Sequence, residues 1–330
     1  MKLKLKAFFI VCGVMAGYAF AQSSLPQWNG YIQTRLSSDL DTTEFTIRRA
    51  KLWVYGNVPQ ADYISYKIQA VYRSFKDETP VIQDAYADII MKCSGKIRAG
   101  RFVPDFMLQR MQPDYEIPVL ERAIVVNSLI HNEKQMARET GLQYLFQPDF
   151  LPAHFSLGVF NANVDKAAHN KDDALLYASR MTYKIISQGN VWLDLGGSAA
   201  FRRLDGTSLT TIYKPDTLIS GKDFRWGAEA HLHWGDLEIQ SEYVQAKINS
   251  DIANGWYALA DYTFLTKYQA VVLADKYTGL NPAVNYNTWY GVGLNRQVTE
   301  KTKIMTDIKT RKSGDKLNSL GEIQLQVFFN

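Results

Sequence analysis

The chain has 330 residues, of which 46% are hydrophobic, 13% aromatic and 21% charged, and its formal net charge is +4. This length and composition are typical of one large folded domain or two ordinary ones, and they exclude a disordered chain. The small net charge argues against a strongly basic nucleic-acid-binding protein, so no nucleic-acid partner is expected.

The first 21 residues are predicted to be a cleaved secretory signal peptide. Three lysines within the first six residues precede an apolar stretch over 7–20, which ends in Ala19-Phe20-Ala21. A basic start, a short apolar run and small residues around the cleavage position are typical of this signal. Cleavage after Ala21 would leave 309 residues, 22–330, and would lower the formal charge from +4 to +1 by removing those lysines.

Alternating apolar and polar residues recur along the rest of the chain and predict about 16 β-strands. The predicted strands are 28–36, 44–56, 61–74, 81–92, 95–102, 137–147, 153–160, 174–187, 191–203, 222–234, 236–248, 255–265, 267–277, 286–295, 301–310 and 319–329. The alternation is clearest between Phe224 and Trp234, where every second residue is apolar. It resumes after Gly235-Asp236, which predicts a hairpin with a tight turn.

The length of these segments favours a membrane barrel over a sandwich of short strands. Many have ten or more residues, whereas strands of water-exposed proteins usually have about five or six, and a tilted membrane strand needs about 9–11. Trp226, Trp234, Trp256 and Tyr262 lie at the ends of apolar faces, where an outer-membrane barrel has its aromatic girdles. No segment after the signal has 18 consecutive apolar residues, so no transmembrane helix is expected.

We therefore predict an all-β fold, a closed antiparallel transmembrane β-barrel of about 16 strands with an inward-folded loop. Closure is required because an unpaired strand edge cannot be satisfied in hydrocarbon. A barrel of this size is wide enough for an aqueous channel. Residues of the polar faces, such as Glu229, His231 and Glu242, are expected to line a water-filled lumen.

One interval, 103–136, breaks the alternation. It contains three prolines and mixes apolar residues with charged ones, including Arg110 and Arg122. A loop of this length in a compact protein usually has a function. We expect it to fold into the lumen as a constriction loop, with Arg101, Arg110 or Arg122 at the narrowest zone. An external surface loop is the alternative.

Several short motifs lie along nearly the whole chain after the signal. They are Phe45-Thr46-Ile47-Arg48-Arg49-Ala50-Lys51-Leu52, Gln83-Asp84-Ala85-Tyr86, Ile97-Arg98-Ala99-Gly100-Arg101-Phe102, Leu120-Glu121-Arg122 and Trp226-Gly227-Ala228-Glu229-Ala230. These motifs resemble the phosphate-selective porin O/P family of outer-membrane anion porins. The resemblance implies a 16-stranded barrel that forms a homotrimer, with a third loop folded inward and a channel that prefers anions.

The resemblance also implies roles for individual residues. Arg48 and Arg49 match the arginine pair of the family's anion path, and Asp84 matches an acidic residue near its constriction. Adjacent strand residues point to opposite faces, so both arginines reach the lumen only if the strand contains a bulge. The candidate pore-lining residues are Arg48, Arg49, Lys51, Asp84, Arg101, Arg110 and Arg122. The alternative is that these cations only balance carboxylates in the lumen.

One position departs from the family's pattern. The loop lysine of the phosphate-selective members falls at Tyr115 here, and its neighbours are Asp114 and Glu116. Because the loop then offers phosphate fewer cationic partners, we expect a weak anion preference without a strong phosphate site.

Neither a metal site nor a catalytic site is expected. Glu229, His231 and His233 share one strand face and have the ligand types of a transition-metal site, but one strand fixes no closed site. The chain has no Gly-x-Ser-x-Gly motif and no phosphate-binding Gly-rich loop. No catalytic residue, metal or other cofactor is therefore assigned.

The sequence as a whole predicts a passive porin of a Gram-negative outer membrane. It would admit small hydrophilic solutes with a weak preference for anions such as phosphate, and its partners would be those solutes and outer-membrane lipid. The alternatives are a non-selective general porin, an outer-membrane enzyme or an adhesin. An adhesin would need long external loops, whereas most connections between the predicted strands are short.

Overall fold

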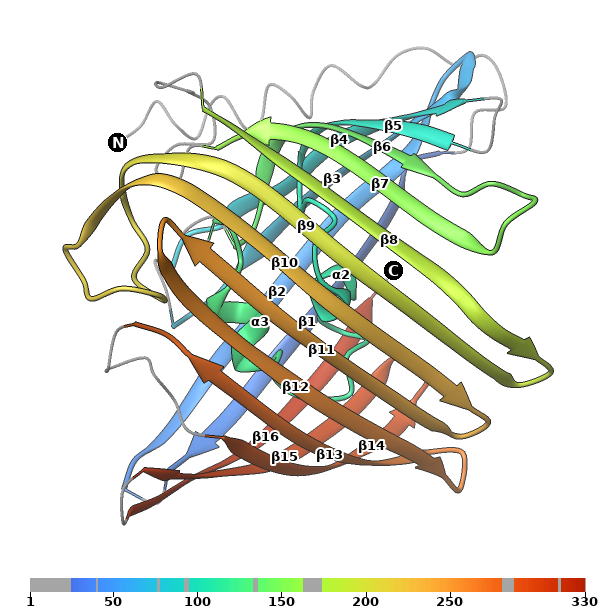
Figure 1. The fold of residues 1–330 in the computed structure, drawn as a ribbon. Coiled ribbons are helices and arrows are strands. Elements are labelled where there is room, and N and C mark those ends of the chain that lie inside the picture. Colours follow the sequence, from blue (N-terminus) through green and yellow to red (C-terminus); the bar gives the residue numbers. More distant parts are fainter. Residues whose placement is uncertain are drawn as a thin grey trace, which may run out of the picture.

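The computed structural model describes residues 25–39, 41–75, 78–91, 95–132, 136–162, 174–280, 288–313 and 316–329, so the predicted signal peptide lies outside the described residues. Sixteen strands form one closed antiparallel barrel (Figure 1). They are β1 (Gln27–Ser38), β2 (Thr43–Val58), β3 (Ala61–Tyr72), β4 (Val81–Met91), β5 (Gly95–Phe102), β6 (Glu139–Phe146), β7 (Ala153–Asn161), β8 (Leu175–Gln188), β9 (Val191–Ser208), β10 (Leu218–Trp234), β11 (Leu237–Ile248), β12 (Asp251–Phe264), β13 (Tyr268–Thr278), β14 (Trp289–Thr299), β15 (Thr302–Ser313) and β16 (Lys316–Phe329).

Each strand pairs with the next one along the chain, and β1 closes the barrel on β16, where Gly30 lies opposite Phe329. The prediction of a closed antiparallel barrel of about 16 strands is confirmed. The boundaries differ most in the β9–β10 hairpin, whose strands reach Ser208 and begin again at Leu218. The register of these strands shifts between Ile219 and Gly221, which interrupts the side-chain alternation although the strands remain paired.

The two faces of the strands have the predicted orientations. The indole rings of Trp226, Trp234 and Trp256 lie on the exposed outer surface, with Trp234 exposed to 63%. Glu229 and Glu242 are buried in the interior. The alternation in the sequence therefore reports correctly which side chains meet lipid and which face the lumen.

The two ends of the barrel carry connections of different lengths. At one end, which we call the turn end, 189–190 and 235–236 each join two strands. Gly189 and Gly235 have φ values of 58° and 61° there, a conformation that glycine adopts without steric cost. The opposite end, which we call the loop end, carries longer connections, including the one between β5 and β6.

The connection between β5 and β6 folds into the barrel, as predicted (Figure 1). Its described part contains two short helices, α2 (Leu108–Met111) and α3 (Ile124–Ser128), and α3 contacts β12 and β13. We call this connection the inward loop. Within the described residues, no helix is both long enough and apolar enough to cross a membrane.

Apolar side chains of the inward loop pack against the barrel wall. Val125 and Leu129 belong to one buried cluster with Tyr257, Leu259 and Tyr277 of β12 and β13. The expectation of a water-filled lumen is therefore wrong for this half of the interior. Most residues on both faces of β12 are apolar, because one face meets lipid and the other is largely covered by the loop, and alternation alone cannot distinguish these environments.

A charge placed on the outer apolar band should destabilise the barrel. Val272 is exposed near the middle of β13, and replacing it with arginine should lower the free energy of unfolding by about 2–4 kcal/mol. Leu218→Arg, at the loop end of β10, is the matched control and should cost about 0–1 kcal/mol. Urea unfolding in lipid vesicles measures both changes, and equal losses at the two positions would contradict the lipid-facing band.

Candidate functional site

The first helix of the inward loop is capped by the barrel wall. Its N-cap residue is Met107, which forms no side-chain cap. The carboxylate of Glu242, on β11, instead accepts hydrogen bonds from the main-chain N–H groups of Leu108 and Gln109, the latter at 3.0 Å. Helix N-termini have N–H groups without intrahelical partners and favour a negative charge, so Glu242 fixes α2 against this wall.

The second helix is held at both ends by wall residues. Asp275 on β13 accepts a hydrogen bond of 3.1 Å from the N–H group of Ile124, at the start of α3. At its other end, Arg225 on β10 donates to the carbonyl groups of Leu129 and Ile130 at 2.9 and 2.8 Å. A carboxylate at the N-terminus and a cation at the C-terminus both match the helix dipole.

Arg225 is itself fixed by a buried ion-pair network. Oδ2 of Asp223 lies 2.8 Å from Nη2 of Arg225 and 2.8 Å from Nε of Arg202. All three side chains are buried. Removing one partner of such a network leaves an uncompensated buried charge, which typically costs about 3–5 kcal/mol. The network therefore gives α3 a rigid attachment.

A β-bulge turns both arginines of the predicted pair towards the loop. The register of β2 against β1 shifts between Gln33 and Thr34, which leaves Arg48 without a cross-strand partner. The bulge that both arginines need in order to face inward is therefore present. Nε of Arg48 lies 2.5 Å from Oε1 of Glu121, and Nη2 of Arg49 lies 3.3 Å from Oε2 of the same carboxylate.

A second carboxylate of the loop, Asp114, is surrounded by cations. It forms ion pairs with Lys51 and Arg122, and its Oδ2 lies 3.5 Å from Nε of Arg49. Burial alone would raise the pKa of Asp114, but these cations outweigh burial and hold the pKa well below its ordinary value. Burial would likewise raise the pKa of Glu121, but its arginine neighbours outweigh burial and lower this pKa as well. Both carboxylates are therefore ionised at neutral pH.

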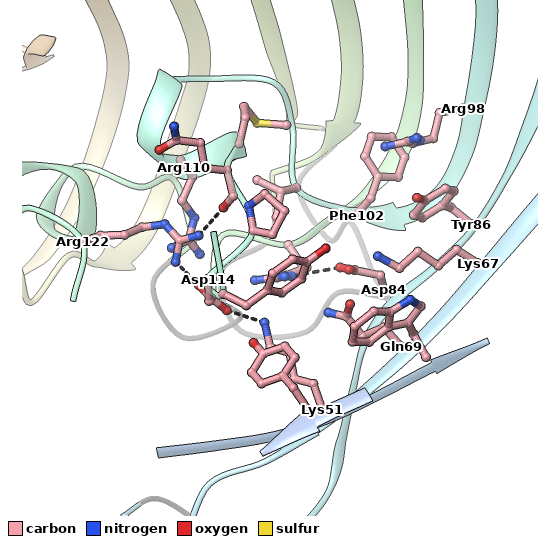
Figure 2. A pocket seen from close by; sticks show the side chains of 18 residues that line it. Lys51, Lys67, Gln69, Asp84, Tyr86, Arg98, Phe102, Arg110, Asp114 and Arg122 are labelled. Carbon is pink, nitrogen blue, oxygen red and sulfur yellow. Dashed lines mark hydrogen bonds and ion pairs between the residues drawn. The ribbon is translucent and has the colours of Figure 1, made fainter. Parts of the chain in front are cut away.

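A cavity of about 200 Å³ lies between the inward loop and the wall formed by β1 to β5, and we call it the central cavity (Figure 2). Its charged lining consists of six cations and two carboxylates. The cations are Lys51, Lys67, Arg98, Arg110, Arg122 and Arg138, and the carboxylates are Asp84 and Asp114. Figure 2 shows Arg110, Asp114 and Arg122 entering from the loop and facing Lys51 and Lys67 on the strands.

Most of the predicted pore-lining residues lie in or beside this cavity. Lys51, Asp84, Arg110 and Arg122 line it, Arg48 lines an adjoining cavity, and Arg49 contacts both loop carboxylates. Arg101 is not among its described lining residues, and its Nε donates to the carbonyl group of Gln83 at 3.3 Å.

Three cations of the central cavity were missed by the sequence analysis. Lys67 and Arg98 lie on the polar faces of the third and fifth predicted strands, so the alternation could have identified them. Arg138, which immediately precedes β6, could not be found in this way, because it is placed by an ion pair of 3.0 Å to Asp84. Among the described residues, Lys67 and Arg110 have no carboxylate within ion-pair distance.

Tyr115 stands where the family resemblance placed a loop lysine, and it packs on the wall. Its ring stacks on Trp53 with centroids 6.1 Å apart and meets Tyr31 and Phe328 edge-on at 5.5 and 5.1 Å. This position therefore provides aromatic contact and no positive charge.

The residues considered for a metal site have other partners. Glu229 forms an ion pair of 2.5 Å with Arg180, and His231 lies 2.6 Å from Glu238. The ring of His233 stacks on an indole ring. Within the part of the chain that the structure describes, no group of three His, Cys, Asp or Glu side chains is placed to hold a metal ion.

Two larger cavities adjoin the central one. A cavity of about 400 Å³ towards the loop end shares Arg122 with it. Another cavity of about 400 Å³ towards the turn end shares Lys67, Tyr86 and Arg98 with it. The central cavity is thus the smallest of these three adjacent spaces, of which the loop-end one also extends to β13–β16.

A closed barrel of 16 strands, with an apolar outer band and a loop folded inside beside a charged cavity, defines an outer-membrane porin. The chain belongs to the phosphate-selective porin O and P family, whose family model matches residues 32–318. The resemblance found in the sequence motifs is therefore confirmed. Among curated proteins, none matches this chain.

Solved porins have the same fold at low sequence identity. The anion-selective porin from Comamonas acidovorans is 9% identical with a TM-score of 0.67, covering 93% of this chain and 100% of that chain. OmpF of Salmonella typhi, in complex with daunomycin, is 12% identical with a TM-score of 0.67, and the match covers 92% of this chain and 97% of that chain. The trimer form of OmpT from Vibrio cholerae is 10% identical with a TM-score of 0.60, and the match covers 93% of this chain and 100% of that chain.

Removing the guanidinium group of Arg225 should release one end of the inward loop. In Arg225→Met the carbonyl groups of Leu129 and Ile130 lose their donor, so single-channel conductance in planar bilayers should become larger and more variable. Arg203→Met removes an exposed arginine from the same barrel and should leave the conductance unchanged. A folded Arg225→Met barrel with the conductance of the unmodified protein would contradict this anchoring role.

Proposed function

We propose that this porin is a passive diffusion channel with a weak preference for small anions, phosphate among them. The observation that carries the proposal is the charge of the central cavity, where six cationic side chains face two carboxylates. Charges that line a narrow pore act over short distances and bias the ions that enter it.

The proposed path runs through the three adjacent cavities from the loop end to the turn end. Four cations and four carboxylates line the loop-end cavity, which is therefore balanced. The turn-end cavity is lined by Lys67, Lys96, Arg98 and one carboxylate, Asp88. An anion on this path would meet an excess of positive charge in the smallest space and in the space after it.

Carboxylates on the opposite wall support this assignment over a non-selective porin. Glu242 is occupied by the N-terminus of α2, and Glu229 is paired with Arg180 of β8. These contacts keep the two negative charges from the β1–β5 side of the barrel, whereas Asp275, which holds α3, also lines the loop-end cavity.

The preference is proposed to be weak because the loop brings its own carboxylates to the cationic wall. Asp114 and Glu121 contact four of the basic side chains on β1 and β2, and Tyr115 adds no charge. Salt screens the remaining charges, so selectivity should decrease as the ionic strength rises.

The setting of the channel is proposed on the same basis. Outer-membrane lipid would contact the apolar band, and the short connections of the turn end would face the periplasm, as in other barrels of this kind. A homotrimer is supported by the trimer form in which OmpT of Vibrio cholerae was solved. Export with cleavage of 1–21 follows from the signal-like sequence at the start of the chain.

Diffusion without a reaction step accounts for the features of the central cavity. Its side chains attract and position an ion, and the proposal assigns none of them a role in catalysis. The alternatives of an outer-membrane enzyme or adhesin have no supporting observation among the described residues.

Reversal potentials under a potassium chloride gradient test the proposal, and chloride should be the more permeant ion. Lys67→Met should lower the chloride-to-potassium permeability ratio about fourfold, since one unit charge at about 10 Å in water contributes about 0.4 kcal/mol, with opposite sign for the two ions. Lys276→Met removes an exposed lysine from the outer side of β13 and should have no effect. A reversal potential that favours potassium in the unmodified channel would overturn the anion preference.

A further inference from the structure

We propose that Asp114 is a built-in counter-anion that occupies an oxyanion site formed by Arg49, Lys51 and Arg122, and that this occupancy sets the channel's low affinity for phosphate-like anions. The inference rests on the proposed anion path and names the residue that limits it. The site is latent, because its cations are present but a side chain of the protein holds them.

The contacts of Asp114 are those expected of a bound anion. Its Oδ1 pairs with Arg122 and its Oδ2 pairs with Lys51 (Figure 2). Oδ2 also lies 3.5 Å from Nε of Arg49. The three cations come from two separate parts of the chain, β2 and the segment of the inward loop between α2 and α3, and converge on one carboxylate. Guanidinium forks and an ammonium group are the donors that bind phosphate and carboxylate oxygens most strongly.

The cationic site does not need Asp114 in order to be built. Arg122 is oriented by the main chain, since its Nε donates to the carbonyl group of Gln109 at 2.9 Å and its Nη2 donates to that of Gln112 at 2.5 Å. Arg49 is oriented by Gln33 at 3.0 Å and by Glu121. Removing the carboxylate of Asp114 would leave the guanidinium groups of Arg49 and Arg122 aimed at the same point, with the ammonium group of Lys51 beside them.

The inward loop is also attached independently of Asp114. Its two helices are fixed by Glu242, Asp275 and Arg225, which lie on the opposite side of the barrel from β2. The described hydrogen bonds of the Asp114 carboxylate come from the side chains of Lys51 and Arg122. Its carboxylate therefore serves charge balance, and the position of the loop depends on other residues.

The site opens onto the proposed path. Asp114, Lys51 and Arg122 all line the central cavity, together with Lys67 and Arg110. An oxyanion that enters this cavity would meet Lys67 and Arg110 but would have to compete with Asp114 for the other cations. A negative charge already in contact with those cations repels the incoming anion and weakens its binding.

The test measures how inorganic phosphate blocks chloride current through single channels of the full-length protein in planar bilayers. Asp114→Asn keeps the side-chain shape and removes the charge, so the phosphate concentration at half-block should fall at least about tenfold, the effect of one charge-assisted hydrogen bond. The double variant with Lys51→Met should return half-block towards the value of the unmodified channel, since one donor is then lost.

Glu116→Gln is the matched control. It removes the same charge from an exposed side chain two residues away in the same loop, and half-block should stay within about twofold of the unmodified channel. Equal shifts in Asp114→Asn and Glu116→Gln, or no shift in either, would overturn the proposal. Should Asp114→Asn fail to insert, Asp114→Ser makes the same comparison. Failure of both to insert would show that Asp114 is needed for folding, which also overturns it.

The two proposals fail in different ways. A channel that prefers potassium in the chloride gradient would remove the proposed anion path, whatever phosphate does. A channel that prefers chloride, but whose phosphate block does not respond to Asp114→Asn, would leave the anion path in place and refute the counter-anion alone.

Discussion

A chain segment that folds inside a barrel must satisfy its main-chain polar groups from the barrel wall, because little water reaches them there. The inward loop meets this requirement with Glu242 and Asp275 at the starts of α2 and α3 and with Arg225 at the end of α3. These three attachments lie on β10, β11 and β13, so they draw the loop to one side. On the other side of the lumen, along β1 to β5, the loop and the wall enclose the central cavity.

The same geometry decides the charge of the β1–β5 side. Cations on β1 and β2 are partly buried by the loop, and a buried charge without a partner is costly. The loop supplies Glu121 and Asp114 as partners, which makes the packing of cations against it possible. Lys67 and Arg110 lie beside these pairs with no carboxylate within ion-pair distance among the described residues, and they contribute two of the four excess positive charges of the central cavity.

Strand positions were predictable to within a few residues, and β5 has the predicted limits at Gly95 and Phe102. Two local features were not. The lumen face of β12 was expected to meet water, yet Tyr257 and Leu259 are buried against the loop. The bulge at Arg48 could be stated only as a condition, because it depends on the register between β2 and β1 and leaves no mark in the residue types.

The sequence by itself determined the barrel, the lipid and lumen faces of its strands and the inward loop. It could do so because side chains alternate with a period of two and because lipid forbids an open sheet edge. Only the tertiary structure decided which charges meet, such as Asp114 with Lys51 and Arg138 with Asp84. These pairs join residues 63 and 54 positions apart, and their contact depends on barrel closure, strand register and the path of the loop, none of which local periodicity encodes.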